Sequence, residues 1–81
     1  MSSSLEDPEY RWLIAHLREL RKAQGLTQTD LAERLDSVQS FIAKTEGFER
    51  RLDILEFVRI CEAIGLKASD VICEFENRFD N

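Results

Sequence analysis

Hydrophobic residues recur at helical spacing along most of the chain, in segments that short turn signals separate. The first segment has Leu13, Leu17 and Leu20 at i, i+4 and i+7, which places them on one face of a helix. Asp7 and Pro8 predict its start, because a capping side chain then precedes proline at the first helical position.

Two shorter amphipathic segments follow, with a turn signal between them that is too short to be a linker. Gly25 predicts the end of the first helix, since glycine commonly follows a helix C-terminus. Thr27 with Asp30 is a variant of the capping box and predicts a helix that ends near Leu35. A third helix is predicted from about Val38 to Glu46, followed by glycine.

Two further helices complete the pattern. Asp53 predicts a cap, and Ile54, Phe57, Val58, Cys61 and Ile64 then fit one helical face that ends at a glycine. The last helix begins at Ala68 or Ser69, with Val71, Ile72, Phe75 and Phe79 apolar. No segment has the pattern of a strand. We therefore predict a compact, all-α, five-helix domain over residues 9–78, preceded by an acidic tail over residues 1–8.

Size and composition narrow the class of protein. The chain has 81 residues of which 43% are hydrophobic, enough for one small core and too many for a disordered chain. Its longest apolar runs are only a few residues, so we expect no contact with a membrane. The polar, acidic start MSSSLEDPEY has no signal-peptide pattern, which predicts a cytoplasmic protein.

No residue set suggests catalysis or metal binding. Two cysteines and one histidine cannot supply a disulfide scaffold or a zinc ligand set, so no metal or cofactor is expected. Cys61 falls on a core stripe and is predicted to be reduced and structural. His16 has no matched nucleophile and the carboxylates are scattered, so we predict neither an enzyme nor a small-molecule ligand.

Charge is distributed unevenly. The net charge is −5, but residues 1–10 and 68–81 carry −3 each, while residues 11–67 hold ten bases and nine acids. A DNA-binding surface needs local rather than global positive charge. The near-neutral middle is therefore compatible with DNA binding, although it lowers the expected affinity for random DNA.

The segment QTDLAERLDSVQSFIAKTEG, residues 28–47, resembles the helix-turn-helix of the Cro and phage-repressor type, also called the Xre or lambda-repressor-like family. LRELRKAQGLTQTDLAERL and RRLDILEFVRICEAIGLKASDVI resemble the two halves of such a domain, so the resemblance covers roughly residues 13–72. It implies a helix-turn-helix at the second and third helices. It also implies a small dimeric transcriptional regulator, a repressor or controller, whose third helix reads double-stranded DNA at a palindromic operator.

The resemblance assigns roles to individual residues. Arg21 and Glu46 match a buried ion pair between the first helix and the end of the third. Phe41 is left with two alternatives, packing in the core or contact with a thymine methyl group. The other candidate DNA contacts are Gln28, Arg50 and Arg51 for phosphates, and Gln39, Ser40 and Lys44 for bases.

Several positions depart from the family pattern. Asp36 stands where glycine is usual in the turn, so we expect left-handed backbone there. Val38 replaces the usual Ser or Thr cap, which leaves Ser37 as the alternative cap of the third helix. Thr45 stands at a commonly apolar position. Gly47 and Phe48 follow Glu46 where a basic residue and then glycine are usual, so the next loop is expected to differ in path.

The last helix carries more apolar residues than one small core needs. We predict that Phe75 and Phe79, with Leu66, form a homodimer interface; the alternative is that both phenylalanines fold back onto Trp12. A second function class also stays open. The fold serves as an antitoxin-like or other protein-binding module, and the acidic ends could then cover a basic partner.

Overall fold

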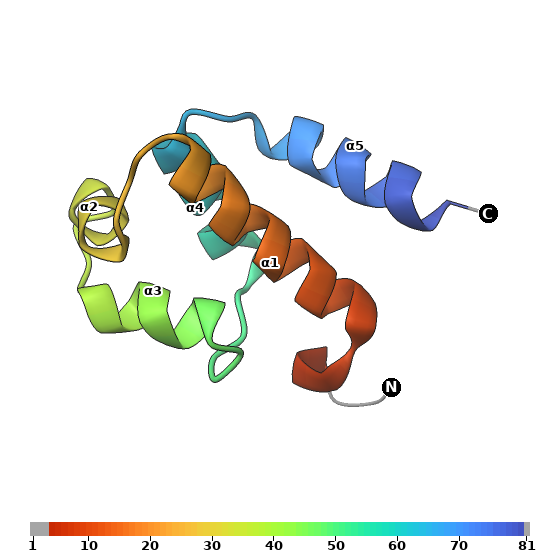
Figure 1. Ribbon diagram of the computed structural model, residues 1–81, viewed down its shortest axis with the longest axis horizontal. Helices are drawn as coiled ribbons and strands as arrows, with labels where there is room; N and C mark the ends of the chain where they lie inside the picture. The colour runs from red at the N-terminus through yellow and green to blue at the C-terminus, as the bar shows by residue number, and fades with distance from the viewer. Residues whose placement is uncertain (1–3, 81) are drawn as a thin grey trace.

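The computed structural model describes residues 4–80. Its elements are a 3-10 turn η1 (Ser4–Glu6) and five α-helices: α1 (Pro8–Ala23), α2 (Gln28–Arg34), α3 (Gln39–Glu46), α4 (Ile54–Ile64) and α5 (Ala68–Phe79). The predicted all-α, five-helix fold is confirmed, and none of the described residues forms a strand. α2 and α3 lie on one side of α1 and α5 lies on the other (Figure 1).

Side-chain caps start three of the helices as the sequence predicts. The Asp7 carboxylate accepts a hydrogen bond from the Glu9 amide at 2.8 Å, with Pro8 at the first position of α1. Thr27 and Asp30 bond each other's backbone amides at 3.0 and 2.9 Å, which is a complete capping box. Asp53 heads α4 with a second capping box.

Every α-helix contributes to one hydrophobic core. The residues it buries are Ile14 and Leu17 of α1, Leu31 and Ala32 of α2, Ile42 of α3, Phe57, Ile60, Cys61 and Ile64 of α4, and Val71 of α5. Burial raises the pKa of the Cys61 thiol to about 11, with a smaller contribution from the charge of Glu62. The thiol is therefore protonated and unreactive at neutral pH.

The turn between α2 and α3 follows one prediction and contradicts another. Asp36 has φ +54, the left-handed backbone expected where the family has glycine. Ser37 does not cap α3, because Val38 occupies the cap position and no side chain there makes a cap hydrogen bond. The capping prediction for Ser37 was wrong. A Val38 side chain has no acceptor; the Phe41 amide bonds the Val38 carbonyl at 3.0 Å, and the amides of Gln39 and Ser40 depend on solvent or on a ligand.

The two residues after α3 differ from what their identities suggest. Gly47 has an ordinary backbone, whereas Phe48 has φ +62, which is strained for a bulky residue. A Cβ on Gly47 would lie 3.1 Å from the Ala43 carbonyl oxygen, a tight contact that favours glycine there. The Phe48 ring packs against the core and lies 4.6 Å from the Arg11 guanidinium.

The N-terminal turn is attached to α1. Arg11 donates to the Leu5 carbonyl at 2.8 Å and pairs with Glu6 at 3.1 Å. η1 therefore belongs to the folded part of the chain, although it lies within the predicted acidic tail. Residues 1–3 of that tail lie outside the described residues. Within residues 4–80, no helix has both the length and the apolarity needed to cross a membrane.

Candidate nucleic-acid interface

α3 has one buried side and one open side. Ile42 and Thr45 face the core with 1% and 3% of their surfaces exposed, while Gln39, Ser40 and Lys44 are exposed. The Thr45 hydroxyl donates to the Phe41 carbonyl at 2.8 Å, which satisfies a polar group at a position that is commonly apolar. The three predicted base-reading side chains are therefore available to a ligand.

A chain of hydrogen bonds connects the open side of α3 with the protein interior. The Gln39 amide donates to the Gln28 side-chain oxygen at 2.7 Å, and the Gln28 amide donates to Glu46 at 3.0 Å. Glu46 in turn accepts from Arg21 of α1. Gln28 therefore lies between the exposed glutamine and a buried carboxylate.

Arg21 and Glu46 form a two-pronged ion pair. The guanidinium donates from Nε at 2.7 Å and from its second nitrogen at 2.9 Å, and both side chains are more than 90% buried. A further nitrogen donates to the Leu26 carbonyl at 2.6 Å, in the loop before α2. A charge buried in this way needs such partners, since desolvation is expensive. The pair joins α1 to the end of α3 and to the loop before α2.

Arg50 is held by protein partners. Its guanidinium donates to both Glu56 carboxylate oxygens, at 3.0 and 2.7 Å, and lies 4.6 Å from the centre of the Phe41 ring. The hydrogen bond to Glu56 raises the pKa of Arg50 and lowers that of Glu56. Phe41 is half-buried against the core and beneath Arg50, so part of its ring packs in the protein. Its contact with a thymine methyl group stays a prediction.

Arg51 is the more open of the two adjacent arginines. Its guanidinium lies 5.8 Å from the Tyr10 ring centre, and Arg51 is exposed. The Tyr10 hydroxyl accepts a hydrogen bond from the Leu52 amide at 3.1 Å, which ties the loop to α1. A guanidinium beside a ring keeps its N–H edges free for an anion.

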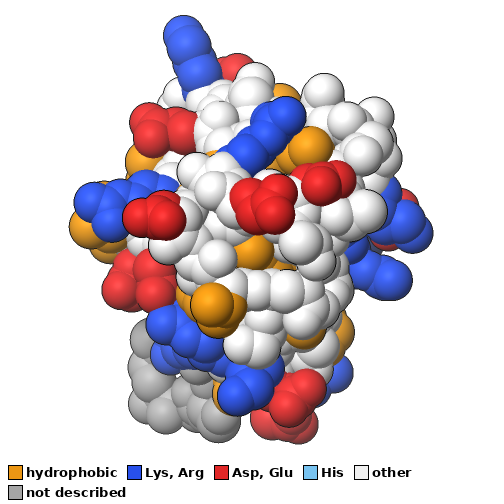
Figure 2. All heavy atoms as spheres, turned by 90° about the vertical axis from the view of Figure 1, so that its left-hand side faces the viewer, with side chains coloured by type: hydrophobic (Ala, Val, Ile, Leu, Met, Phe, Trp, Pro, Cys, Tyr) orange, Lys and Arg blue, Asp and Glu red, His pale blue; other side chains and the backbone are white. Residues whose placement is uncertain are grey.

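The side of the molecule that carries α2 and α3 has mixed charge. Figure 2 shows acidic and basic side chains interspersed there, with no continuous basic surface. Lys44 is the only base of α3, and Arg34 of α2 donates to the Ala63 carbonyl at 2.8 Å. Asp30, Glu33 and Asp36 add negative charge to the same motif. Local charge therefore supports a small number of phosphate contacts rather than strong non-specific binding.

Some contacts could not be predicted from the sequence. The capping box Asp53-x-x-Glu56 places Glu56 at the start of α4, but its second role as partner of Arg50 depends on how the loop folds. The link from Gln28 to Gln39 has no local signal, since the residues are eleven positions apart on different helices.

The predicted interface residues of α5 lie against the same chain. The Phe79 and Phe75 ring centres lie 5.6 and 6.2 Å from that of Trp12, as in the alternative considered above. Leu66 is partly buried against the core. Both rings remain partly exposed, so the part played by Leu66, Phe75 and Phe79 in a homodimer stays a prediction.

The chain belongs to the Xre-type helix-turn-helix family. Residues 12–71 match the family model described as "Helix-turn-helix domain". Among solved structures, the chain is similar to an XRE-family like protein from Pseudomonas syringae pv. tomato str. DC3000. The two share 42% sequence identity over 88% of this chain and 87% of the other, with a TM-score of 0.85.

The chain is also similar to the clp gene regulator ClgR from Corynebacterium glutamicum. Identity there is 25% over 90% of this chain and 78% of that one, with a TM-score of 0.76. No curated protein matched the sequence. The fold and the family are those of DNA-binding regulators rather than of enzymes. Within residues 4–80, no three His, Cys, Asp or Glu side chains gather into a group that could hold a metal ion.

Proposed function

We propose that this protein binds double-stranded DNA sequence-specifically through α3, as a small dimeric transcriptional regulator in the cytoplasm. The observation that carries the proposal is the open side of α3, where Gln39, Ser40 and Lys44 are exposed and Gln39 is oriented by Gln28. An α-helix fits the major groove, and side chains of these types can bond base edges or phosphates there.

The hydrogen bond to Gln28 leaves Gln39 with a defined recognition capacity. A glutamine amide has two N–H donors and one carbonyl acceptor, and one donor is used by Gln28 at 2.7 Å. One donor and the acceptor remain, which is the pair that binds the N7 and N6 positions of adenine. We therefore expect an adenine opposite Gln39 in the preferred site.

Gln28 keeps one N–H as well, since its other amide hydrogen is directed to Glu46. That N–H lies at the first turn of α2 and is available to a phosphate oxygen. A phosphate contact at Gln28, with a further contact from Arg51, fixes the register of α3 on the duplex. For Arg50 we expect a weaker role, because both terminal nitrogens of its guanidinium already donate to Glu56.

A regulator of this size needs two copies to select one site, because one helix-turn-helix covers only a few base pairs. Two copies related by a two-fold axis read half-sites roughly 34 Å apart in a palindromic operator. The interface proposed from the sequence is Leu66, Phe75 and Phe79. The exposed residues Ile54 and Leu55, here called the α4 pair, are a second apolar candidate at 74% and 53% exposure.

Selection from a random duplex library, followed by fluorescence anisotropy on the selected site, tests the proposal. We expect the Gln39→Ala/Lys44→Ala variant to lose roughly 1–3 kcal/mol of binding free energy for each base contact removed, and less on random DNA. Gln24→Ala/Lys67→Ala is a matched control, because it removes the same two residue types from exposed positions outside α2 and α3.

Two results would contradict the proposal. One is failure to select any sequence from the library. The other is a Gln39→Ala/Lys44→Ala variant that protects the selected site in footprinting as the wild type does, which would show that α3 is not the reading helix.

A further inference from the structure

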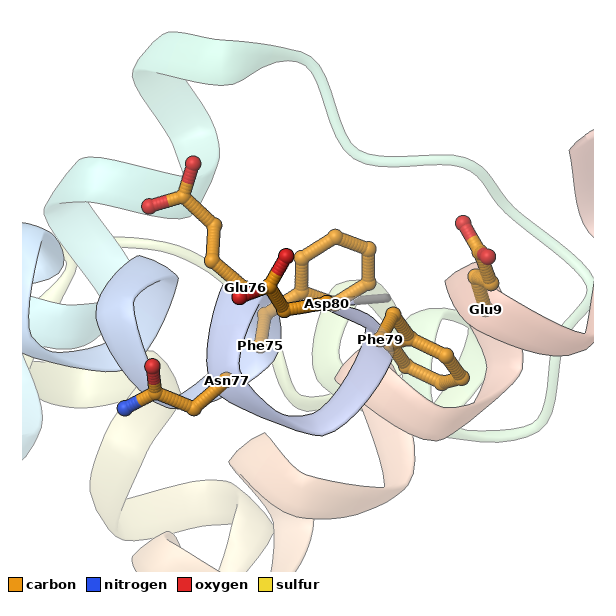
Figure 3. A pocket seen from close by; sticks show the side chains of 6 residues that line it. All are labelled: Glu9, Phe75, Glu76, Asn77, Phe79 and Asp80. Atoms are coloured by element: carbon orange, nitrogen blue, oxygen red, sulfur yellow. The ribbon is translucent and has the colours of Figure 1, made fainter.

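An open hollow of about 530 Å³ lies beside the C-terminal end of α5. Figure 3 shows two aromatic rings in it with polar side chains around them. The lining residues are Glu9, Phe75, Glu76, Asn77, Phe79 and Asp80. Glu9 comes from the first turn of α1, and the others come from α5 and the residue after it. α3 lies across α1 from this helix (Figure 1), so the hollow plays no part in the proposed DNA contact.

The aromatic part of the hollow is braced from behind. The Phe75 and Phe79 ring centres are 5.0 Å apart, and the Trp12 and Phe79 rings meet edge to face at an interplanar angle of 90°. His16 stacks on Trp12 at 4.8 Å and bonds Glu74 at 3.1 Å, which ties α1 to α5. The two rings are therefore held in place before any ligand arrives, so they lose less conformational entropy when a ligand binds to them.

The rim of the hollow is negative and its charges are unpaired. Glu9, Glu76 and Asp80 form no ion pair with any described residue. The C-terminal end of a helix such as α5 adds a partial negative charge from its last carbonyl groups. Aromatic ring faces attract cations as well. All three features favour the same kind of ligand, a cation with a flat or apolar body.

The chain already shows this chemistry at one of the two rings. The guanidinium carbon of Arg78 lies 5.4 Å from the centre of Phe79. A guanidinium is planar, stacks on rings and bonds carboxylates with its N–H edge, whereas an ammonium group is a strongly hydrated point charge. The combination of rings and carboxylates in the hollow therefore suits arginine better than lysine.

We propose that this hollow is a docking site for an arginine side chain presented by a basic segment of a partner protein. A ring face receives the guanidinium plane, and the Asp80 carboxylate, which Figure 3 shows beside the rings, bonds its N–H groups. Glu76 and Glu9, on opposite sides of the rings, add negative charge to the rim. This docking and a homodimer through Phe75 and Phe79 exclude each other, because both use the same two rings, so the docking goes with a dimer formed through the α4 pair. A two-fold contact at the hollow would also bring the same three carboxylates of each copy together. The proposal does not rest on DNA binding.

The test is a titration of the full chain, at physiological salt, with the peptides acetyl-hexaarginine amide and acetyl-hexalysine amide. Trp12 is the only tryptophan and touches both rings, so its emission reports on the hollow. We expect saturable binding of hexaarginine, about threefold tighter than that of hexalysine. The reason is that only a guanidinium both stacks on an aromatic ring and donates two parallel hydrogen bonds to a carboxylate. Glu76→Gln/Asp80→Asn should weaken hexaarginine binding about fivefold, the effect of losing two exposed negative charges.

The matched control is Glu33→Gln/Glu62→Gln, which removes the same amount of charge from exposed positions on α2 and α4. Equal weakening by both variants would overturn the proposal, because it would show attraction to overall charge alone. Hexaarginine that leaves Trp12 emission unchanged would also overturn it. So would Trp12 emission that changes on dilution without peptide, since a second copy would then fill the hollow. Operator binding by Glu76→Gln/Asp80→Asn should stay at the wild-type level. The peptide titration contains no DNA, so a failure of the proposed DNA binding would not change its result.

Discussion

Removal of Arg21 is the most demanding test of how α3, the helix proposed to read DNA, is held. The Glu46 carboxylate is more than 90% buried, and in an Arg21→Met variant it loses both guanidinium hydrogen bonds, at 2.7 and 2.9 Å. The Leu26 carbonyl loses its 2.6 Å donor as well. Breaking a buried pair costs roughly 3–5 kcal/mol when the remaining charge is left alone. Glu46 keeps the Gln28 amide at 3.0 Å and the exposed Arg18 guanidinium at 3.8 Å, so we expect a loss within the lower half of that range.

A loss of that size is a large fraction of the total. Small domains are stable by roughly 5–15 kcal/mol, and 1 kcal/mol shifts the melting temperature of a domain of this size by about 4–8 °C. A loss of about 3–4 kcal/mol then lowers the melting temperature by roughly 12–32 °C. Thermal and urea unfolding followed by circular dichroism measure the effect. Lys22→Met is the matched control, because its partner Glu19 is 4.0 Å away and both side chains are exposed.

The double variant Arg21→Met/Glu46→Leu separates a buried ion pair from simple loss of packing. Apolar replacement of both partners is often neutral, so we expect the double variant to be more stable than Arg21→Met by about 2 kcal/mol. Two results together would refute the reasoning. One is that the losses of Arg21→Met and Glu46→Leu add up in the double variant, and the other is that Arg21→Met melts close to the Lys22→Met control. A normally melting Arg21→Met that binds operator poorly would instead make Arg21 a DNA contact.

Three further predictions concern other parts of the molecule. If α5 forms the dimer, Phe75→Asp/Phe79→Asp should sediment as a folded monomer with weakened operator binding. Ile54→Asp/Leu55→Asp in the α4 pair should then leave the dimer intact, and the reverse pattern would exclude α5. A thiol reagent should modify exposed Cys73 quickly in the native protein and Cys61 only on unfolding, and two equally fast thiols would contradict the core assignment. The pKa of Glu56 is lowered mainly by a guanidinium hydrogen bond, so its contribution to stability is present above pH 4.5, its ordinary pKa, and is lost as pH falls through the lower folded value. Glu56→Gln should therefore show a shallower fall in urea midpoint with acid, and an unchanged slope would count against the pair.

The helices could be predicted from the sequence because their information is local. Caps such as Thr27 and Asp53 act within one turn, and apolar residues at helical spacing define the face that is buried. The ends of α2, α3 and α4 lie close to their predicted positions for this reason. Asp36 was predictable as well, because few residues accept left-handed backbone.

The contacts that position the side chains of the candidate site were harder to predict from the sequence. Arg50 reads as a free cation in the sequence, but the loop after α3 folds so that Glu56 and Phe41 hold it. In that loop Phe48 has left-handed backbone and Gly47 does not. Residue identity alone would suggest left-handed backbone at the glycine instead. Tertiary context overrides local preference at these positions, and strain of this kind is common near functional sites.

The hydrogen-bond chain from Gln39 through Gln28 and Glu46 to Arg21 bears on how a mutational screen of this protein should be interpreted. If α3 binds DNA as proposed, a selection that scores only DNA binding would rank Arg21 and Glu46 beside Gln39, although the first two are buried. A contact map drawn from such scores would extend the apparent DNA footprint into the interior. Scoring abundance in parallel would divide the same set of positions into those that touch DNA and those that hold the reading helix in place.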